Sequence, residues 1–134
     1  MLINKNSFKI NSVNMGDYLL QIEFGRNKLW GSDTGRNLKG STTGTFLGIV
    51  PKFKLTFRKL TQEELEFLSP ILDSAWQETE YYDCNSKQQE TIETYTGDWA
   101  TLNKNIFSNV AKANESFDIS VIGTEPRLYN ESSL

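Results

Sequence analysis

The stretch KFKLTFRKL, residues Lys52–Leu60, carries the clearest secondary-structure signal in the chain. Phe53, Leu55 and Phe57 occupy alternate positions, and basic or polar residues stand between them. Because successive side chains of a β-strand point to opposite faces, this pattern predicts a strand with one apolar face and one basic face. Pro51 suits the first position of such a strand, where a missing N–H group disturbs pairing least.

The next residues, TQEELEFLSPILDSA, predict a helix that follows this strand directly. Thr61 can cap the first turn, and Glu64 three residues later completes a capping box. Leucines and other apolar residues at helical spacing then form one stripe. We expect the helix over about residues 62–74, with a kink or an end near Ser69 because Pro70 lacks an N–H group.

Four further segments predict strands. In DYLLQIEF, which ends at Phe24, alternation predicts that Leu20 and Ile22 share one face with Tyr18 and Phe24. WQETEYYD and QETIETYTGDW are rich in Tyr, Thr and Trp, and predict a hairpin that turns across Cys84–Lys87. SFDISVIG, near the carboxyl end, again alternates apolar and polar residues.

The organisation expected is one domain of 134 residues with about five or six strands, one helix and no alternating βαβ pattern. This favours a mainly β (α+β) fold, an antiparallel β-sandwich or barrel-like sheet with one flanking helix. A long loop over residues 25–48 holds six of the nine glycines, and loops of that length are usually functional or disordered. The tail at about residues 126–134 is expected to be loose.

Composition argues against several classes of function. The chain has no histidine, which is the commonest general base and metal ligand, and its single cysteine excludes an internal disulfide. The net charge of −3 gives no global attraction to nucleic acid. No apolar run approaches the roughly 18 residues of a membrane span, and we expect no signal peptide and a reducing compartment.

No catalytic motif is complete. GRNLKGST has the glycine spacing of a phosphate-binding loop, but its lysine precedes the second glycine instead of following it. Glu78 and Glu80 share a strand face, and most such carboxylates are simply solvated. Cys84 lies beside Asp83, which would raise the pKa of a thiol and not activate it. We therefore expect no catalytic residue, no cofactor and no metal.

The charges are strongly segregated along the chain. Residues 26–59 carry a net charge of +7, and residues 62–94 carry −8. Either the basic and acidic strands are neighbours in one sheet and neutralise each other, or a basic surface meets the acidic surface of a second copy. In the second case complementary charge would set register and partner choice.

The long loop also carries spaced apolar residues, which suits docking onto a neighbouring subunit. The alternative is a flap folded on its own domain, with Trp30 in the core. For docking, the candidate contacts in the loop are Arg26, Lys28, Trp30, Asp33, Arg36 and Lys39. The candidate acidic counterparts are Glu63, Glu66, Glu78 and Glu80.

A cluster of aromatic residues on the predicted hairpin supports a different class of function. Trp76 and Trp99 flank this hairpin, and aromatic platforms can stack sugars or bases. Cross-strand pairs that support the sheet are the alternative explanation. A carbohydrate-binding module for host attachment is therefore a second hypothesis.

The run NKLWGSDTGRNLKGSTTGTFLGIVPKFKLTFRKLTQEELEFLSPILDS and the later YTGDW resemble a family of small structural proteins of phages and prophages of Gram-positive bacteria. In that family a GRNLxG loop leads into a basic strand, LTxEEL opens a helix, and a YxGD turn follows. The resemblance covers about Asn27–Trp99. The arrangement is also similar to the phage tail-tube type of fold, in which a long loop reaches an adjacent subunit.

The resemblance implies a non-enzymatic virion protein, made in the bacterial cytoplasm. It implies a tail component (tail tube, distal tail or tail-completion ring) or, alternatively, a head–tail connector or neck protein. Its partners would be copies of itself in a ring, possibly of six, and other virion proteins. No sequence-specific nucleic-acid binding, membrane contact or cofactor is implied.

Overall fold

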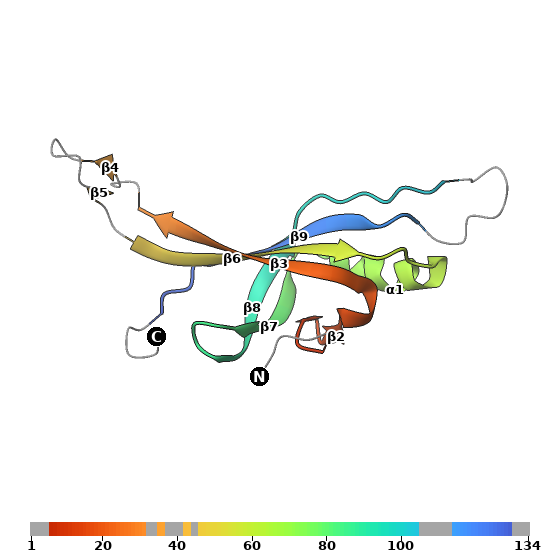
Figure 1. The fold of residues 1–134 in the computed structure, drawn as a ribbon, viewed down its shortest axis with the longest axis horizontal. Coiled ribbons are helices and arrows are strands. Elements are labelled where there is room, and N and C mark those ends of the chain that lie inside the picture. Colours follow the sequence, from red (N-terminus) through yellow and green to blue (C-terminus); the bar gives the residue numbers. More distant parts are fainter. Residues whose placement is uncertain (1–5, 32–34, 37–41, 44–45, 105–113, 130–134) are drawn as a thin grey trace.

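The computed structural model describes residues 6–31, 35–36, 42–43, 46–104 and 114–129. They form one open sheet of seven antiparallel strands, in the order β2-β1-β7-β8-β9-β6-β3, with a single α-helix, so the mainly β prediction with one helix is confirmed (Figure 1). The strands of the sheet are β1 (Lys9–Ile10), β2 (Val13–Asn14), β3 (Leu19–Trp30), β6 (Phe46–Phe57), β7 (Gln77–Asp83), β8 (Gln88–Thr96) and β9 (Phe117–Gly123). The remaining elements are the 3₁₀-helix η1 (Gly16–Tyr18), the two-stranded pair β4 (Gly35–Arg36) and β5 (Thr42–Thr43), and α1 (Gln62–Leu72).

The sheet curls so that distant strands pack face to face around one core. Phe53 on β6 lies with its ring centroid 4.9 Å from that of Tyr81 on β7, although β8 and β9 separate these strands in the sheet. Phe53, Leu55 and Phe57 of β6 are buried, as predicted. Leu68 and Leu72 bring α1 onto the same cluster. The apolar side of the predicted strand therefore organises the core.

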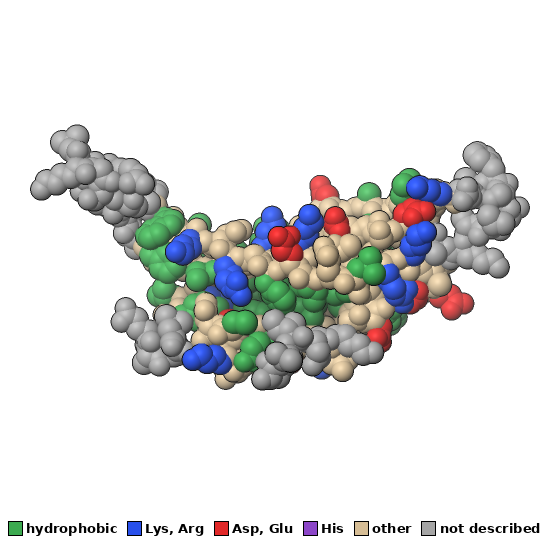
Figure 2. All heavy atoms as spheres, viewed as in Figure 1, with side chains coloured by type: hydrophobic (Ala, Val, Ile, Leu, Met, Phe, Trp, Pro, Cys, Tyr) green, Lys and Arg blue, Asp and Glu red, His purple; other side chains and the backbone are tan. Residues whose placement is uncertain are grey.

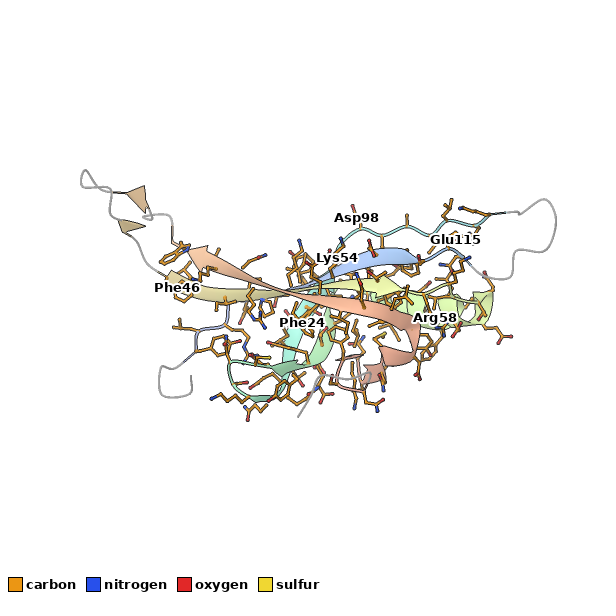
Figure 3. All side chains as sticks on the ribbon, in the orientation of Figure 1. Phe24, Phe46, Lys54, Arg58, Asp98 and Glu115 are labelled. Atoms are coloured by element: carbon orange, nitrogen blue, oxygen red, sulfur yellow. The ribbon has the colours of Figure 1, made fainter. Side chains whose placement is uncertain are left out.

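The predicted bounds of the long loop, residues 25–48, are wrong on both sides. β3 and β6 pair from Leu19 opposite Phe57 to Trp30 opposite Phe46, with register shifts at Leu19/Gln21 and Leu29/Trp30, so the connection runs only from Gly31 to Thr45. The resulting long hairpin projects beyond the rest of the sheet (Figure 1). Figure 3 places Phe46 and Arg58 toward its opposite ends. Glycine density suggested a loop, but pairing with an apolar partner strand extended this segment instead.

The prediction for Leu20 is also wrong. A register shift between Leu19 and Gln21 interrupts the β3–β6 pairing, which is the signature of a β-bulge. Leu19 consequently packs against the core with Ile22 and Phe24, whereas Leu20 is 65% exposed. An extra residue in one strand reverses the face of its neighbours, and strict alternation in the sequence cannot reveal it.

The helix begins as the sequence predicts. Thr61 accepts a hydrogen bond from the Glu64 backbone N–H, and the Glu64 carboxylate accepts one from the Thr61 N–H, completing the capping box. Pro70 lies inside α1, which continues to Leu72, so the predicted end near Ser69 is wrong. Pro70 removes one helical hydrogen bond, and the helix then ends within a few residues.

The described part of the tail, which ends at Tyr129, is hydrogen-bonded to the β3–β6 hairpin. Ile49 and Arg127 exchange two backbone hydrogen bonds, of 2.8 and 2.7 Å, which adds a short bridge to the hairpin. Gly48 makes this close approach possible, because its φ is +136° and a Cβ there would lie 2.7 Å from the Arg127 carbonyl oxygen. Residues 130–134 of the predicted tail lie outside the described part.

Candidate interaction surfaces

The projecting part of the hairpin carries an exposed apolar patch. We call residues 25–31 and 46–51 the arm. Trp30 and Phe46 pack against each other across its strands, with ring centroids 5.1 Å apart, and Trp30 is 43% exposed. Leu29 and Leu47 beside them are also exposed. Trp30 is therefore not in the core of its own domain, and the alternative of a flap folded onto that core is wrong for this residue.

Basic side chains accompany this patch. Arg26 and Lys28 are exposed on β3 and precede Trp30 by four and two residues, the spacing of side chains on one strand face. Among the described residues, no carboxylate lies within ion-pair distance of either. Figure 2 shows hydrophobic side chains with basic ones beside them where the hairpin leaves the body. The arm thus presents apolar and cationic groups together.

The other predicted loop contacts are only partly covered by the structure. Arg36 lies in β4, which pairs with β5. Asp33 and Lys39 lie outside the described residues. Of the six predicted loop contacts, Arg26, Lys28 and Trp30 therefore share a described surface.

The predicted acidic counterparts fall into two groups. Glu63 and Glu66 are exposed on α1. Glu80 on β7 lies 4.0 Å from the Lys9 ammonium group. Glu78, also on β7, stands directly opposite Glu93 of β8. The structure thus places Glu78 in a like-charge pair, which the sequence did not indicate.

Charge neutralisation between adjacent basic and acidic strands does not occur as that alternative proposed. The basic strand β6 pairs with β3 and β9, and the acidic strands β7 and β8 are not its neighbours. Lys54 of β6 stands opposite Glu23 of β3 and Ser120 of β9. The carboxylates of β7 and β8 therefore do not face the basic strand β6, and Glu80 pairs with Lys9 of β1 instead.

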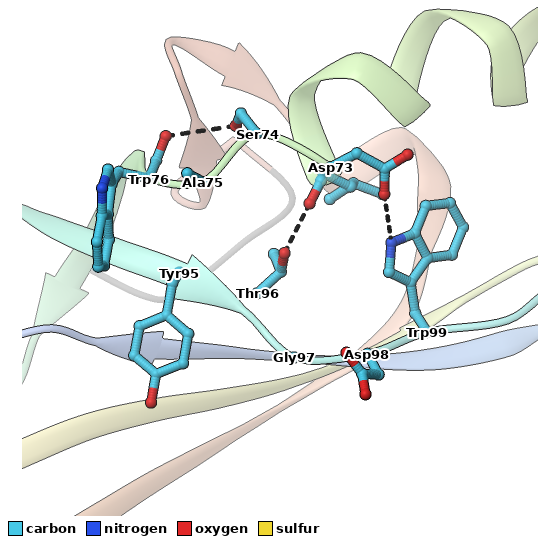
Figure 4. Close-up of a pocket in the computed structure, with 10 residues that line it drawn as sticks. Asp73, Ser74, Ala75, Trp76, Tyr95, Thr96, Gly97, Asp98 and Trp99 are labelled. Carbon is cyan, nitrogen blue, oxygen red and sulfur yellow. Dashed lines mark hydrogen bonds between the residues drawn. The ribbon is translucent and has the colours of Figure 1, made fainter.

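A cleft of about 590 Å³ opens where α1 ends and β7 begins (Figure 4). Its walls come from residues 72–76 and 95–99. Trp76 and Tyr95 face each other edge to face at its rim, with centroids 6.2 Å apart, and Trp76 is 61% exposed. The carboxylates of Asp73 and Asp98 also line it. An acidic, aromatic-rimmed cleft of this kind accepts cationic, apolar or hydroxylated groups.

The aromatic residues of the predicted hairpin therefore separate into two roles. The Trp99 indole N–H donates a hydrogen bond of 2.9 Å to Asp73, and its ring stacks on Phe117. Phe117 in turn stacks on Phe57, so Trp99 continues the core. Trp76 has no such support and stands at the surface.

A buried polar cluster holds the tail against the hairpin turn, and no pattern in the sequence indicated it. The hydroxyl groups of Tyr81 and Tyr129 both donate to Asp83. Burial alone would raise the pKa of Asp83, but hydrogen bonds from Tyr129, the Asn85 N–H and Tyr81 outweigh it and lower the pKa. Burial, followed by the nearby Asp83 charge, raises the pKa of Tyr81.

Arg127 completes this cluster, 3.8 Å from Asp83 and 3.5 Å from Glu90. Every group in it has a partner. The arrangement is therefore that of a structural anchor, with no free group positioned for chemistry.

No protein-family model, curated protein or solved structure matches this chain. In the described part of the chain, no helix has the length and apolar character to span a membrane. Within those same residues, no group of three or more acidic or cysteine side chains is arranged to hold a metal ion.

Proposed function

We propose that this chain is a non-enzymatic structural protein of a phage virion, a tail component that assembles into a homo-oligomeric ring through the arm. The motif resemblance over Asn27–Trp99 supports the class of protein. The ring would belong to the tail tube, the distal tail or the tail-completion complex, and the head–tail connector is the alternative position. The resemblance to the tail-tube type of fold would imply a ring of six.

The observation that carries this proposal is the Trp30–Phe46 pair on a projecting hairpin. The four apolar side chains of the arm are between 37% and 44% exposed, so burying the remainder of each would contribute roughly 1 kcal/mol and would favour association with another surface. Contiguous exposed apolar patches on a small domain usually mark an interaction site. A paired hairpin also presents them with little ordering cost, because its backbone is already fixed.

Charge supports association between copies in preference to an unrelated apolar partner. The arm adds Arg26 and Lys28 to its apolar groups, while β7 and β8 present carboxylates. A basic surface that meets an acidic one elsewhere on an identical chain makes a head-to-tail contact, and such contacts form rings when the rotation closes. Partners among other virion proteins would then bind the faces of the ring.

The test uses the double variant W30S/F46S, which removes the exposed aromatic pair from the arm. This variant should remain folded, because both side chains lie outside the core, and should lose assembly. Sedimentation and electron microscopy measure the assembly, and far-ultraviolet circular dichroism measures the fold. Phe67→Ala, which removes an exposed aromatic side chain from α1, is the matched control and should assemble normally.

Virions are the second readout. Mass spectrometry of purified particles should find the wild-type chain in several copies per particle and should not find W30S/F46S. Particles that contain W30S/F46S at the wild-type level, or particles that lack the wild-type chain, would count against the proposal.

A further inference from the structure

The surface next to the cleft combines exposed aromatic and charged side chains, as the arm does, but its charge is negative. Gln77 and Thr94 are buried, so Glu78 and Glu93, the next residues along the two strands, point to the outer face. Tyr95 lies two residues after Glu93 on β8 and therefore on the same face, and Trp76, which directly precedes β7, contacts Tyr95. We call the Trp76–Tyr95 rim and the Glu78–Glu93 pair together the acidic strip.

The Glu78–Glu93 pair is unfavourable in the isolated chain. Like charges directly opposite each other on adjacent antiparallel strands destabilise a sheet. Among the described residues no basic side chain lies within ion-pair distance of either carboxylate. A cation from outside the chain would relieve this repulsion.

The spacing of aromatic and charged groups matches between the two surfaces. On the arm, Lys28 lies two residues from Trp30, which is about 7 Å along a strand. On the acidic strip, Glu93 lies two residues from Tyr95 on β8, again about 7 Å. Both aromatic residues also have an aromatic neighbour across the strand pair. The arm contributes no residue to the walls of the cleft in its own chain.

We infer that the arm of one copy docks on the acidic strip of a second copy, with Trp30 and Phe46 packed at the Trp76–Tyr95 rim. Lys28 then lies against Glu78 and Glu93. Arg26 extends the same contact along the strand. This inference rests on the proposed assembly through the arm and names the surface that receives it. The cleft beside the rim gives the aromatic groups of the arm a concave site, as central anchors of interfaces require.

Charge reversal on each surface tests the inference. The arm variant is R26E/K28E, and the strip variant is E78K/E93K. Each variant alone places like charges against each other, so each should fail to self-associate. An equimolar mixture should associate, because the reversed arm of one chain meets the reversed strip of the other. Sedimentation at low ionic strength measures all three samples, and added salt should weaken the wild-type assembly.

Trp76→Ala tests the aromatic part of the contact. Loss of a central aromatic anchor should weaken association by about 30-fold or more. Phe67→Ala is again the control for an exposed aromatic residue and should change nothing. Circular dichroism and thermal melting verify that every variant is folded.

The outcomes separate this inference from the proposed function. If the arm variant fails to associate but the strip variant and Trp76→Ala assemble like wild type, the arm binds elsewhere and only this inference is overturned. If wild type and every variant behave identically, both are overturned. Trp76→Ala that assembles normally but loses binding to cell-wall polysaccharide would assign the cleft to carbohydrate and overturn the docking site.

Discussion

Glu64→Gln should destabilise the junction between β6 and α1 in a pH-dependent way. Arg58 donates two hydrogen bonds to the Glu64 carboxylate, of 3.1 and 2.6 Å, while the Thr61 N–H donates a third, of 3.1 Å. Arg58 also donates to the Asp17 carbonyl, so it ties η1, the end of β6 and the start of α1 together. Glutamine keeps an acceptor for Thr61 but removes the charge that binds Arg58.

The magnitude follows from the pKa of Glu64. The hydrogen bonds from Arg58, and then from the Thr61 N–H, lower this pKa from 4.5 to about 2. Without solvent screening, a shift of that size would correspond to about 3 kcal/mol of the free energy of unfolding. The Arg58 and Glu64 side chains remain 36% and 26% exposed, so solvent screening reduces the expected contribution to about 1–2 kcal/mol.

The sign of the pH dependence is fixed by the direction of the shift. The pKa of Glu64 is lower in the folded state, so its contribution is complete above about pH 4.5 and disappears as the pH falls through about 2. The difference in free energy of unfolding between wild type and Glu64→Gln should therefore be about 1–2 kcal/mol near neutral pH and should shrink toward zero at about pH 2.

Urea unfolding followed by tryptophan fluorescence at several pH values measures this difference. Glu63→Gln is the control, because Glu63 is also in the first helical turn but has no arginine partner, and it should lose only about 0.3–0.5 kcal/mol. A Glu64→Gln deficit that stays constant between neutral pH and about pH 2 would refute the assignment to the Arg58 ion pair.

Four further substitutions test other features. Gly48→Ala should lower the free energy of unfolding by about 1–3 kcal/mol and increase proteolysis after Arg127, because the φ of +136° and the nearby Arg127 carbonyl oxygen leave no room for a Cβ. Unchanged stability and protease resistance would contradict this. Trp99→Ala should lower the free energy of unfolding by roughly 3 kcal/mol, whereas Trp76→Ala should change it by no more than about 0.5 kcal/mol. Equal losses of stability in urea unfolding would contradict the separate roles of the two residues. Leu20→Ser should be neutral within about 0.5 kcal/mol by thermal unfolding, and a large loss would place Leu20 in the core.

Local patterns predicted the elements that depend on neighbouring residues. The alternation from Phe53 to Phe57 and the capping box at Thr61 require only the side chains of adjacent turns or strand positions. The hairpin around Cys84–Lys87 formed as predicted for the same reason, because its strands are close in sequence. The first short strands, which bury Phe8 and Ile10, carried too few residues for any periodic pattern.

The sequence identified candidate contacts but not their surroundings. Clustered charge drew attention to Arg26 and Lys28, and the structure shows no ion-pair partner for either among the described residues. The pairing of Glu78 with Glu93 was not predictable, because it depends on the register between β7 and β8. The cleft was missed because its two walls come from segments that are about 20 residues apart and meet only through the sheet.

The sequence by itself determined the mainly β class, the helix with its cap, and the segregation of basic from acidic residues, since each is a property of short segments. Only the tertiary structure decided that β3 and β6 extend into an arm, that a bulge turns Leu20 outward, and that Arg127 anchors the tail beside Ile49. These features depend on hydrogen bonds and packing between residues distant in the chain. Such contacts are selected by the free energy of the whole fold, and no local pattern encodes them.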